Sequence, residues 1–525
     1  MQKLTKESLR TLLEARVLKR EKQLRDIPNP ALLHDGNKVA KRLARAVNNG
    51  EKICVVGDYD VDGVTSVAII KEFFKLIDYP LEIVIPNRFR DGYGVSPALL
   101  ERIDANVIVT VDNGITAVAA GEVCANRGID LLITDHHTPP AVLPKAYAIV
   151  DPKLSTCDYP FKEICGAEVI WLVLGLLKKE LHADVNMRGF VDFLALGIVA
   201  DIMPLVDVNR ALVQDGLKML MQGERASSIV IREFLNKTTI GSEDIAFMIA
   251  PRLNSAGRLD DASLAVEFLT AASIEEAYVC FEKLNNLNEK RKKIESDTTK
   301  EAIALANDED EVIIVAKEGW HEGVVGIVAS RLVEHFSKPA LVLSINGNTA
   351  KGSGRSLADV NMFMLLQEHK GLFEKFGGHA MAVGVSLQVE NLKQLQENLN
   401  KAARKLPKEA FVVKDELLGV LDAKAIDFSL LEILEEFEPY GEANPKPKFL
   451  LKDAKVLEVK VFGKEKNHCR IKVQMDSNKG IFHELVLFRS VVDSAQKSLS
   501  CSYTISRNEF NNITTMQLHV NKIYG

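Results

Sequence analysis

Cysteine is scarce in this sequence, and the cysteines present do not form a recognisable metal site. Only seven occur among 525 residues, and none lies in a C-x-x-C pair or at zinc-type spacing. Structural zinc sites need such spacing, and disulfide frameworks need paired cysteines in an oxidising compartment. The sequence therefore predicts neither zinc fingers nor disulfides, and it favours reduced thiols.

Long uncharged apolar runs are also missing. The first twenty residues, MQKLTKESLRTLLEARVLKR, are charged throughout and lack the apolar core of a signal peptide. No later stretch reaches the roughly 18 uncharged residues that a membrane span needs. We therefore expect a cytoplasmic protein that does not insert into a membrane.

An excess of basic charge is absent as well, since 66 Lys and Arg face 72 Asp and Glu, for a net charge of −6. This balance argues against a uniformly basic nucleic-acid binder. Any contact with a polyanion must come from local basic surface or from bound cations.

The composition otherwise describes a globular protein, with 47% hydrophobic and 26% charged residues and no internal repeat. A chain of this length exceeds one hydrophobic core, so several domains are expected. We predict an N-terminal helical collar (1–49), a catalytic domain (50–270), a connecting helix (271–308), a substrate-binding domain (309–405), and a linker with a small β-barrel (406–525).

Strand and helix patterns alternate after residue 49. Apolar runs at 52–57, 81–86, 106–112 and 130–135 are separated by helical patterns, and residues 162–270 are mostly helical. A second alternation begins at 311–316. Such alternation is typical of βαβ units with parallel sheets. We therefore expect two α/β lobes joined by a long helix.

The segment VVGDYDVDGVTS (55–66) carries Asp58, Asp60 and Asp62 directly after a buried strand. Three carboxylates at the carboxyl end of a strand would repel one another without a cation among them. Oxygen ligands suit Mg²⁺ or Mn²⁺. The alternative is an acidic turn that only begins a helix.

The next two predicted strands also end on polar residues. VIVTVDNG ends on Asp112, and LLITDHH ends on Asp135, His136 and His137. Strands of a parallel sheet present their carboxyl ends at one edge, where ligands bind, so these side chains should converge. Repetition at the same topological position favours a metal site over isolated helix caps.

Asp201 interrupts the apolar helix pattern LALGIVADIMPL (194–205). A buried unpaired aspartate is costly, so Asp201 is either a further ligand or a cap with its own hydrogen bonds. With Asp112 as a bridge and at least one histidine, the set supplies enough ligands for two cations, as in two-metal phosphoryl chemistry.

These motifs resemble a known family. GDYDVDG, VDNG, TDHH and ALGIVADIMPL resemble motifs I to IV of the DHH phosphoesterases. PNRFRDGYG (86–94), APRLNSAGRLDDA (250–262) and GWHEGVVGIVASRL (319–332) resemble the RecJ exonucleases within that superfamily. The resemblance implies a DHH parallel-sheet domain and a DHH-associated domain, followed by an OB-like barrel. It also implies a 5′ to 3′ single-strand DNA exonuclease that releases mononucleotides in recombination and repair.

The resemblance also assigns roles to residues. It implies metal binding for Asp58, Asp60, Asp62, Asp112, His136 and Asp201, and catalytic roles for Asp58, Asp60, Asp62, Asp135, His136 and His137. Many superfamily members have histidine where this chain has Val56. We expect Asp58 to compensate for that difference.

The second lobe contains NGNTAKGSGRS (346–356) and FGGHAMAVGVSL (376–387), which resemble the DHH-associated domain. Glycines allow backbone to approach phosphates closely, and cationic or imidazole side chains donate to them. Structural turns are the alternative for the glycines. The candidates for substrate contact are Arg88, Arg252, Arg258, His321, Arg355, Gly378 and His379.

The tail is expected to bind single strands by stacking bases on aromatic side chains. Phe449, Phe462 and Phe488 are candidate platforms, although each could instead belong to the core. We expect a monomer that uses two Mn²⁺ or Mg²⁺ ions and has single-strand-binding protein and a helicase as partners.

Two alternatives remain. A DHH phosphodiesterase could act on short oligoribonucleotides or cyclic dinucleotides, but such enzymes typically lack the collar and the tail. A non-enzymatic replication scaffold would have lost metal ligands, whereas this chain retains the full Asp and His set.

Overall fold

The computed structural model describes residues 3–17, 22–463, 466–476, 480–510 and 513–524. The chain forms two compact units, each treated by itself. One comprises residues 1–253, 263–281 and 416–525, and the other comprises residues 254–262 and 282–415.

A five-stranded parallel sheet forms the centre of the first unit, in the order β3-β2-β4-β5-β6. Its strands are β2 (Ile53–Val56), β3 (Glu82–Val84), β4 (Val107–Val111), β5 (Asp130–Thr134) and β6 (Ala148–Val150). The central strands are fully buried because helices cover both faces, which explains their continuous apolar sequence.

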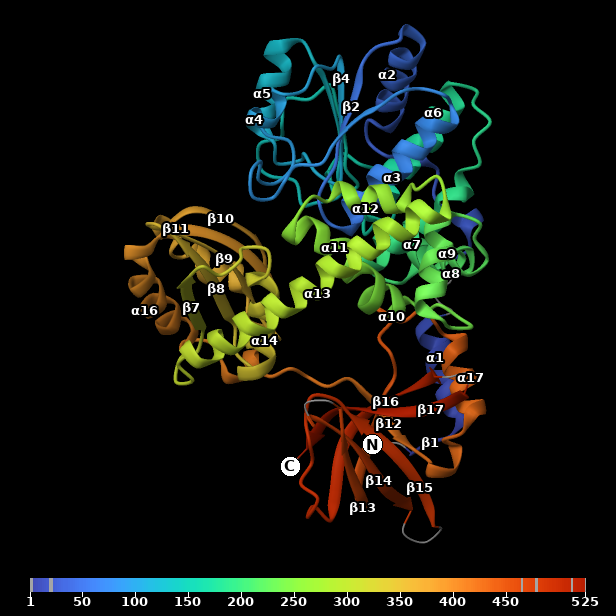
Figure 1. Cartoon of the computed structure of the whole chain (residues 1–525), viewed down its shortest axis with the longest axis vertical. Helices are drawn as coiled ribbons and strands as arrows, with labels where there is room; N and C mark the ends of the chain where they lie inside the picture. The colour runs from blue at the N-terminus through green and yellow to red at the C-terminus, as the bar shows by residue number, and fades with distance from the viewer. Residues whose placement is uncertain (1–2, 18–21, 464–465, 477–479, 511–512, 525) are drawn as a thin grey trace. The chain divides into compact units, whose positions relative to one another are not determined.

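The helices of this domain lie in two layers (Figure 1). One face of the sheet carries α2 (Gly36–Asn49), α3 (Val61–Leu76) and α6 (Gly166–Glu180), and the other carries α4 (Pro97–Leu100) and α5 (Val118–Arg127). Ile108 and Ile133 of the sheet pack with Leu100 and Ala120 on the α4–α5 side. This arrangement confirms the expected α/β class.

The register of the sheet aligns the ends of its strands. Val56 pairs with Thr110, Thr110 with Ile133, and Ile133 with Ile149. Residues that follow these positions by equal steps therefore lie in rows across the sheet.

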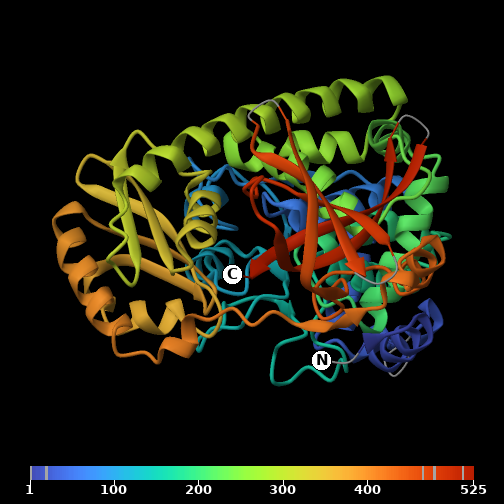
Figure 2. The ribbon, with the colours of Figure 1, turned by 90° about the horizontal axis from the view of Figure 1, so that it is seen from below.

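Helices dominate the rest of the catalytic domain. They are α7 (Val191–Ala200), α8 (Asp207–Gln222), α9 (Ala226–Leu235), α10 (Ser242–Asp244), a π-helical turn (Ile245–Ile249), α11 (Ala250–Leu259) and α12 (Ser263–Leu269). The long helix α13 (Ile274–Leu305) follows and runs for 32 residues without a break (Figure 2). Among the described helices, none combines the length and the apolar character that a membrane crossing requires.

The second unit contains a mixed sheet in the order β10-β11-β9-β8-β7. Its elements are β7 (Ile313–Glu318), α14 (Val325–Phe336), β8 (Ala340–Asn346), β9 (Thr349–Arg355), α15 (Met362–Gln367), β10 (Phe373–His379), β11 (Ala382–Gln388) and α16 (Leu392–Ala403). Only β7 and β8 are parallel. Separate apolar clusters cover the two faces, one of them built with α14 and the other with α15 and α16.

The C-terminal residues of the first unit form a closed barrel of five strands, because β13 pairs with both β14 and β16. Its elements are β12 (Leu417–Leu421), α17 (Phe428–Glu436), β13 (Lys448–Phe462), β14 (His468–Asp476), β15 (Ile481–Leu487), β16 (Ser498–Phe510) and β17 (Ile513–Tyr524). The expected OB-like barrel is confirmed.

The first residues of the chain belong to this barrel. Strand β1 (Lys3–Leu4) pairs in parallel with β12, and helix α1 (Lys6–Val17) buries Leu9 and Leu13 in the barrel core. The expected collar of residues 1–49 is therefore divided, since α2 packs against α6 of the catalytic domain. The sequence pattern of α1 predicts a buried face, but it does not identify the barrel as the surface that covers this face.

The barrel is also fastened to helix α8. The buried guanidinium of Arg210 donates hydrogen bonds to the backbone carbonyls of Phe437, Glu438 and Pro439. Leu205 N–H donates to the Glu442 carbonyl over 2.8 Å. The segment 437–442 thus ties the barrel to the chain that follows Asp201.

Candidate metal centre

The register of the sheet places four aspartates in one row at its carboxyl edge. Two residues beyond the aligned positions Val56, Thr110, Ile133 and Ile149 lie Asp58, Asp112, Asp135 and Asp151. All four side chains are almost completely buried. The first three were expected at this edge, and the structure brings them together.

Asp151 was missed by the sequence reasoning. It follows the short strand AIV (148–150) in the segment YAIVDP. The rule that identified Asp112 and Asp135, an acidic residue directly after an apolar run, would have found it. The run has only three residues, which is at the short end for a strand and makes its signal weak.

The first aspartate loop is held by the beginnings of two helices. Asp60 is the N-cap of α3 and accepts a hydrogen bond from Gly63 N–H. Asp62 accepts bonds from Gly166 N–H (2.5 Å) and Ala167 N–H (3.0 Å), at the start of α6. Free backbone N–H groups at a helix start stabilise a carboxylate, so α6 fixes the orientation of Asp62.

Glycine at position 166 allows α6 to approach the centre. A Cβ atom there would lie 2.7 Å from Oδ1 of Asp112 and 2.6 Å from its Cβ. Asp112 itself has a left-handed backbone with φ of 60°. Its carboxylate is therefore positioned by an unusual backbone and by a close helix.

His136 joins the carboxylates from three different elements. Its Nε2 atom lies 3.1 Å from Oδ1 of Asp112, 3.6 Å from Oδ2 of Asp201 and 3.7 Å from Oδ2 of Asp62. Asp201 caps the end of α7, which brings it to the sheet edge. The structure therefore unites residues from all four motifs.

Burial and mutual repulsion disturb the ionisation of this cluster. Burial, followed by neighbouring aspartates, raises the pKa of Asp58 and of Asp112 well above the ordinary value. The same causes raise the pKa of Asp201 to about 8. Burial lowers the pKa of His136 to about 4, so its ring is neutral and retains a lone pair.

These residues fit a divalent cation. Ligand atoms lie within 4.8 Å of one another in three groups: Asp58, Asp60 and Asp112; Asp62, His136 and Asp201; and Asp112, His136 and His137. The buried Oδ1 of Asp112 and both ring nitrogens of His136 have no hydrogen-bond partner among the described residues. Buried polar atoms need partners, and a cation would supply them.

Asp135 serves a different purpose from the other members of the row. Its carboxylate accepts hydrogen bonds from the backbone N–H groups of Ile115, His136 and His137, and its Oδ1 lies 2.7 Å from Nδ1 of His137. Burial opposes ionisation of Asp135, but the bonds from His137 prevail and lower its pKa. The same pairing overcomes burial to raise the pKa of His137 to about 9. Asp135 therefore orients a protonated His137.

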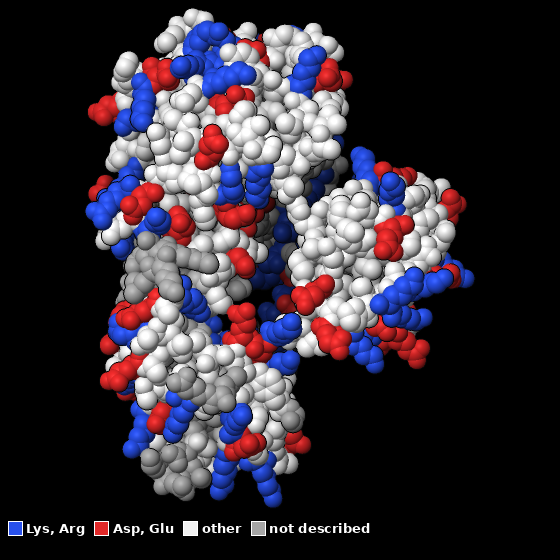
Figure 3. All heavy atoms as spheres, turned by 180° about the vertical axis from the view of Figure 1, so that it is seen from behind, with Lys and Arg blue, Asp and Glu red and all other residues white. Residues whose placement is uncertain are grey.

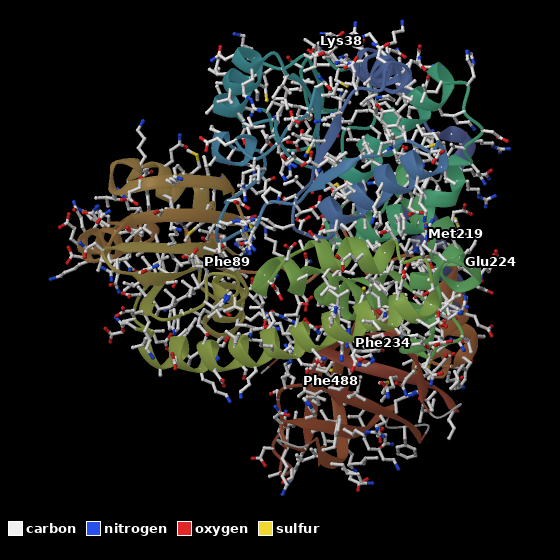
Figure 4. All side chains as sticks on the ribbon, turned by 45° about the horizontal axis from the view of Figure 1, so that its top comes forward. Lys38, Phe89, Met219, Glu224, Phe234 and Phe488 are labelled. Atoms are coloured by element: carbon white, nitrogen blue, oxygen red, sulfur yellow. The ribbon has the colours of Figure 1, made fainter. Side chains whose placement is uncertain are left out.

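The loop 87–94 brings Arg88 to the aspartate loop. The Arg88 guanidinium lies 4.5 Å from the centre of the Tyr59 ring, and Tyr59 contacts Tyr93 edge to face. Ion pairs from Arg90 and Arg102 to Asp91 hold the loop, and Phe89 on it is labelled in Figure 4.

Arg252 is buried in the first unit. Its guanidinium lies 4.2 Å from the centre of the Phe234 ring, which Figure 4 labels, and donates to the Met248 carbonyl. These contacts give Arg252 a packing role. Its contact with substrate stays a prediction.

The second unit gathers other candidates for substrate contact. Arg258 donates to the Gly323 carbonyl, and Nδ1 of His321 accepts from Gly323 N–H. Arg355 donates to Ser353 Oγ at 2.7 Å, and a Cβ at Gly326 would lie 3.1 Å from its Nη2. Arg355 therefore lies beside the start of α14.

The β10–β11 hairpin carries the remaining two candidates. Gly378 has φ of 134°, and a Cβ there would lie 2.3 Å from the Ala382 carbonyl oxygen. Only glycine fits this position, so the turn itself requires it. His379 ends β10, opposite Ala382, which pairs with Arg355 on the next strand.

Comparison with known proteins identifies three domains in the chain. Residues 52–198 match the DHH family, N-terminal domain, residues 309–405 match the DHHA1 domain, and residues 419–522 match the RecJ OB domain. The RecJ exonuclease of Escherichia coli is 32% identical over 525 residues, covering 93% of this chain and 90% of that protein. RecJ of Bacillus subtilis is 34% identical over 94% of this chain, which spans 64% of that longer protein.

Solved structures show the same relationship. RecJ of Thermus thermophilus with Mn²⁺ has a TM-score of 0.80 at 28% identity, covering 95% of this chain and 73% of that one. Its structure with Mg²⁺ has a TM-score of 0.77 at 26% identity, covering 99% and 74%. The chain therefore belongs to the RecJ family of single-stranded-DNA-specific exonucleases, as a metal-dependent hydrolase of the DHH class.

Proposed function

We propose that this protein removes mononucleotides from the 5′ end of single-stranded DNA by two-cation hydrolysis of phosphodiester bonds. The observation that carries the proposal is the convergence of Asp62, Asp112 and Asp201 on the neutral His136. A cluster of this composition suits Mn²⁺ or Mg²⁺, the ions bound in the two RecJ structures.

Asp58, Asp60, Asp62, Asp112, His136 and Asp201 would hold the cations. Bound ions supply Lewis acidity that activates water and stabilises the departing oxygen. The Asp135 carboxylate fixes Nδ1 of His137, so its Nε2 is left to hold a proton for the departing oxygen.

Substrate binding is assigned to cations and glycines outside the cluster. Arg88 lies at the aspartate loop. In the second unit, His321 belongs to the GWHEG segment, Arg258 donates to Gly323 of that segment, and Arg355 lies beside Gly326. Guanidinium groups bind phosphate through paired hydrogen bonds. Gly378 and His379 would approach the nucleotide from their hairpin.

The barrel would extend the binding surface to longer strands. Phe488 is 49% exposed and stacks on His519, and Arg470 lies 5.5 Å from the centre of the Phe462 ring. Figure 4 labels Phe488 on the barrel, and Figure 3 shows Lys and Arg side chains projecting from the barrel face in view, with acidic ones among them. Aromatic rings beside cations are typical of single-strand binding.

Phe449 does not belong to this surface. It is fully buried and packs against Tyr503 inside the barrel. The expectation that it serves as a stacking platform is therefore wrong, because β13 turns this side of the strand toward the core. Phe462 and Phe488 remain as candidates.

The competing functions fit these observations less well. A scaffold without activity has no use for a buried carboxylate cluster whose members resist ionisation. A hydrolase of short oligoribonucleotides or cyclic dinucleotides has no use for a closed barrel with exposed aromatic rings. We extend the proposal to repair and recombination in the cytoplasm, with a monomeric enzyme that acts beside single-strand-binding protein and a helicase.

The test uses single strands of DNA and RNA labelled at either end, with and without Mn²⁺. We expect a 5′ label on DNA to appear at once as mononucleotide, and a 3′ label to remain on shortening strands. Asp112→Asn serves as the inactive control. Release of the 3′ label first would contradict the polarity, and faster cleavage of RNA would contradict the substrate.

A further inference from the structure

The fourth member of the aspartate row has no part in the chemistry described above. Asp151 is fully buried, and its Oδ1 accepts a hydrogen bond from Lys153 N–H over 2.7 Å. Its Oδ2 is buried without a donor among the described residues. The Leu154 N–H also bonds the Asp151 carbonyl, so residues 151–154 form a tight turn at the end of β6. This turn fixes the backbone of Lys153.

Lys153 is the cation that this turn presents at the sheet edge. Its side chain is half-buried, and the ion pairs found within the described part of the chain include none from its ammonium group. The turn lies at the carboxyl end of β6, beside strand β5, which carries Asp135 and His136 at its own carboxyl end. The Lys153 side chain therefore starts from the same edge of the sheet as the proposed metal ligands.

We propose that Lys153, held in place by Asp151, contacts a phosphate of the substrate at the metal centre. The row of carboxylates repels an approaching phosphodiester, and an unpaired ammonium group at the end of the row offsets that repulsion. Lysine binds phosphate as a point charge and needs no paired geometry. Asp151 is a positioning residue, since it acts through the turn that carries Lys153.

The inference rests on the proposed function, because a phosphate contact here presumes a phosphodiester substrate. It is tested by Lys153→Ala, with kcat and KM measured in Mn²⁺ at several salt concentrations. We expect KM to rise roughly tenfold to a hundredfold, as for removal of one hydrogen bond to a charged group, with a smaller change in kcat. The salt dependence of log kcat/KM should flatten by about 0.7 when one phosphate interaction is removed.

A second readout avoids turnover. Calorimetry with a deoxynucleoside 5′-monophosphate in the presence of Mn²⁺ should show weaker binding to Lys153→Ala, and titration with Mn²⁺ alone should be unchanged. Lys153→Arg should restore most of the affinity. Lys145→Ala is the matched control. This exposed lysine lies in the loop between β5 and β6, and it pairs with Glu122 of α5.

Variants of Asp151 separate positioning from direct ligation. Asp151→Asn retains an oxygen that can accept from Lys153 N–H and should behave like the parent, whereas Asp151→Ala should resemble Lys153→Ala. The double variant Asp151→Ala with Lys153→Ala should be no worse than either change alone. Additive effects would contradict the positioning role, and loss of Mn²⁺ affinity in Asp151→Asn would show that Asp151 is a ligand instead.

The proposed function and the role of Lys153 can fail separately. If the unchanged protein cleaves no labelled strand, the proposed function is wrong. If it cleaves single strands but Lys153→Ala keeps its KM, monophosphate affinity and salt dependence, only the role of Lys153 is refuted.

Discussion

Single residues of the metal centre repel one another in the absence of a cation, and this makes stability depend on pH. The pKa of Asp201 is raised to about 8 by burial and by Asp62 and Asp60, against about 3.9 in an unfolded chain. A raised carboxyl pKa means that the folded state holds the proton more tightly. Without divalent cation, stability should therefore fall as pH rises from about 4 to about 8.

Asp201→Asn removes this penalty. We expect the metal-free variant to be more stable than the parent at pH 8, by up to about 3 kcal/mol, and similar to it near pH 4. Saturating Mn²⁺ should reverse the order, and hydrolysis should be lost. Urea denaturation at both pH values measures the effect, with the exposed Asp308→Asn as control. A variant less stable than the parent at pH 8 would contradict the repulsion.

The pair of Asp135 and His137 predicts a second pH effect. Burial lowers the pKa of His137, but its bond to Asp135 raises it to about 9. The stabilisation by this pair is present below about pH 6.5 and is lost as pH rises through 9. In Asp135→Asn the pKa of His137 should fall, so the alkaline decline of kcat should move to lower pH. An unchanged profile would mean that His137 does not control the rate.

Reading the sequence residue by residue identified most of the cluster, because buried carboxylates at strand ends carry a physical cost that needs an explanation. It did not separate the roles of Asp112 and Asp135, which occupy equivalent strand ends. The difference lies in their surroundings: Asp135 receives backbone N–H donors, whereas Oδ1 of Asp112 has none among the described residues. Loop conformation decides this, and no local pattern records it.

At the scale of elements, helix α6 is a support of the centre, and two of its glycines allow a matched comparison. A methyl group at Gly166 would collide with Asp112, whereas at Gly175 it would meet nothing within 4 Å. Gly166→Ala should weaken Mn²⁺ binding and slow turnover, because α6 or Asp112 must shift. Gly175→Ala should leave both unchanged and stabilise the helix by up to about 1 kcal/mol.

Calorimetry with Mn²⁺ and thermal unfolding of both variants check this prediction. If Gly166→Ala bound Mn²⁺ as tightly as Gly175→Ala, then the close approach of α6 would have no influence on the ligands.

The helices and strands themselves could be predicted from the sequence, because buried parallel strands and amphipathic helices have distinct periods. The partner of α1 did not follow, since an amphipathic face does not identify a surface at the far end of the chain.

At the scale of the whole molecule, the barrel cannot be removed as a simple appendage. A cut near Lys405 would leave Leu4, Leu9 and Leu13 without their core and Arg210 without its acceptors. A deletion that removes α1 together with the barrel avoids this exposure of α1, and it retains residues 22–405. We expect it to unfold at lower temperature, to cleave short oligonucleotides, and to bind long strands more weakly.

Each phosphate interaction that the barrel supplies should steepen the salt dependence of log affinity by about 0.7, and each base stacked on it should contribute roughly 1–3 kcal/mol. The deletion should remove both contributions, and binding of short and long strands across a salt series measures them. Unchanged long-strand affinity and slope would assign the barrel to protein partners.

The order of the α/β lobes and the barrel along the chain was predictable from the sequence. The packing of β1 and α1 against the barrel was not.

The pairing of β1 with β12 has a consequence for synthesis of the protein on the ribosome. Leu13 leaves the ribosome about four hundred residues before strand β12, an interval on the order of 20–80 s at 5–20 residues per second. Helix α1 must wait for its partner during that time, with an apolar face exposed. Helix α1 is therefore made well before it can pack onto the barrel, and the nascent chain should be open to proteases around α1 until the barrel strands have been made.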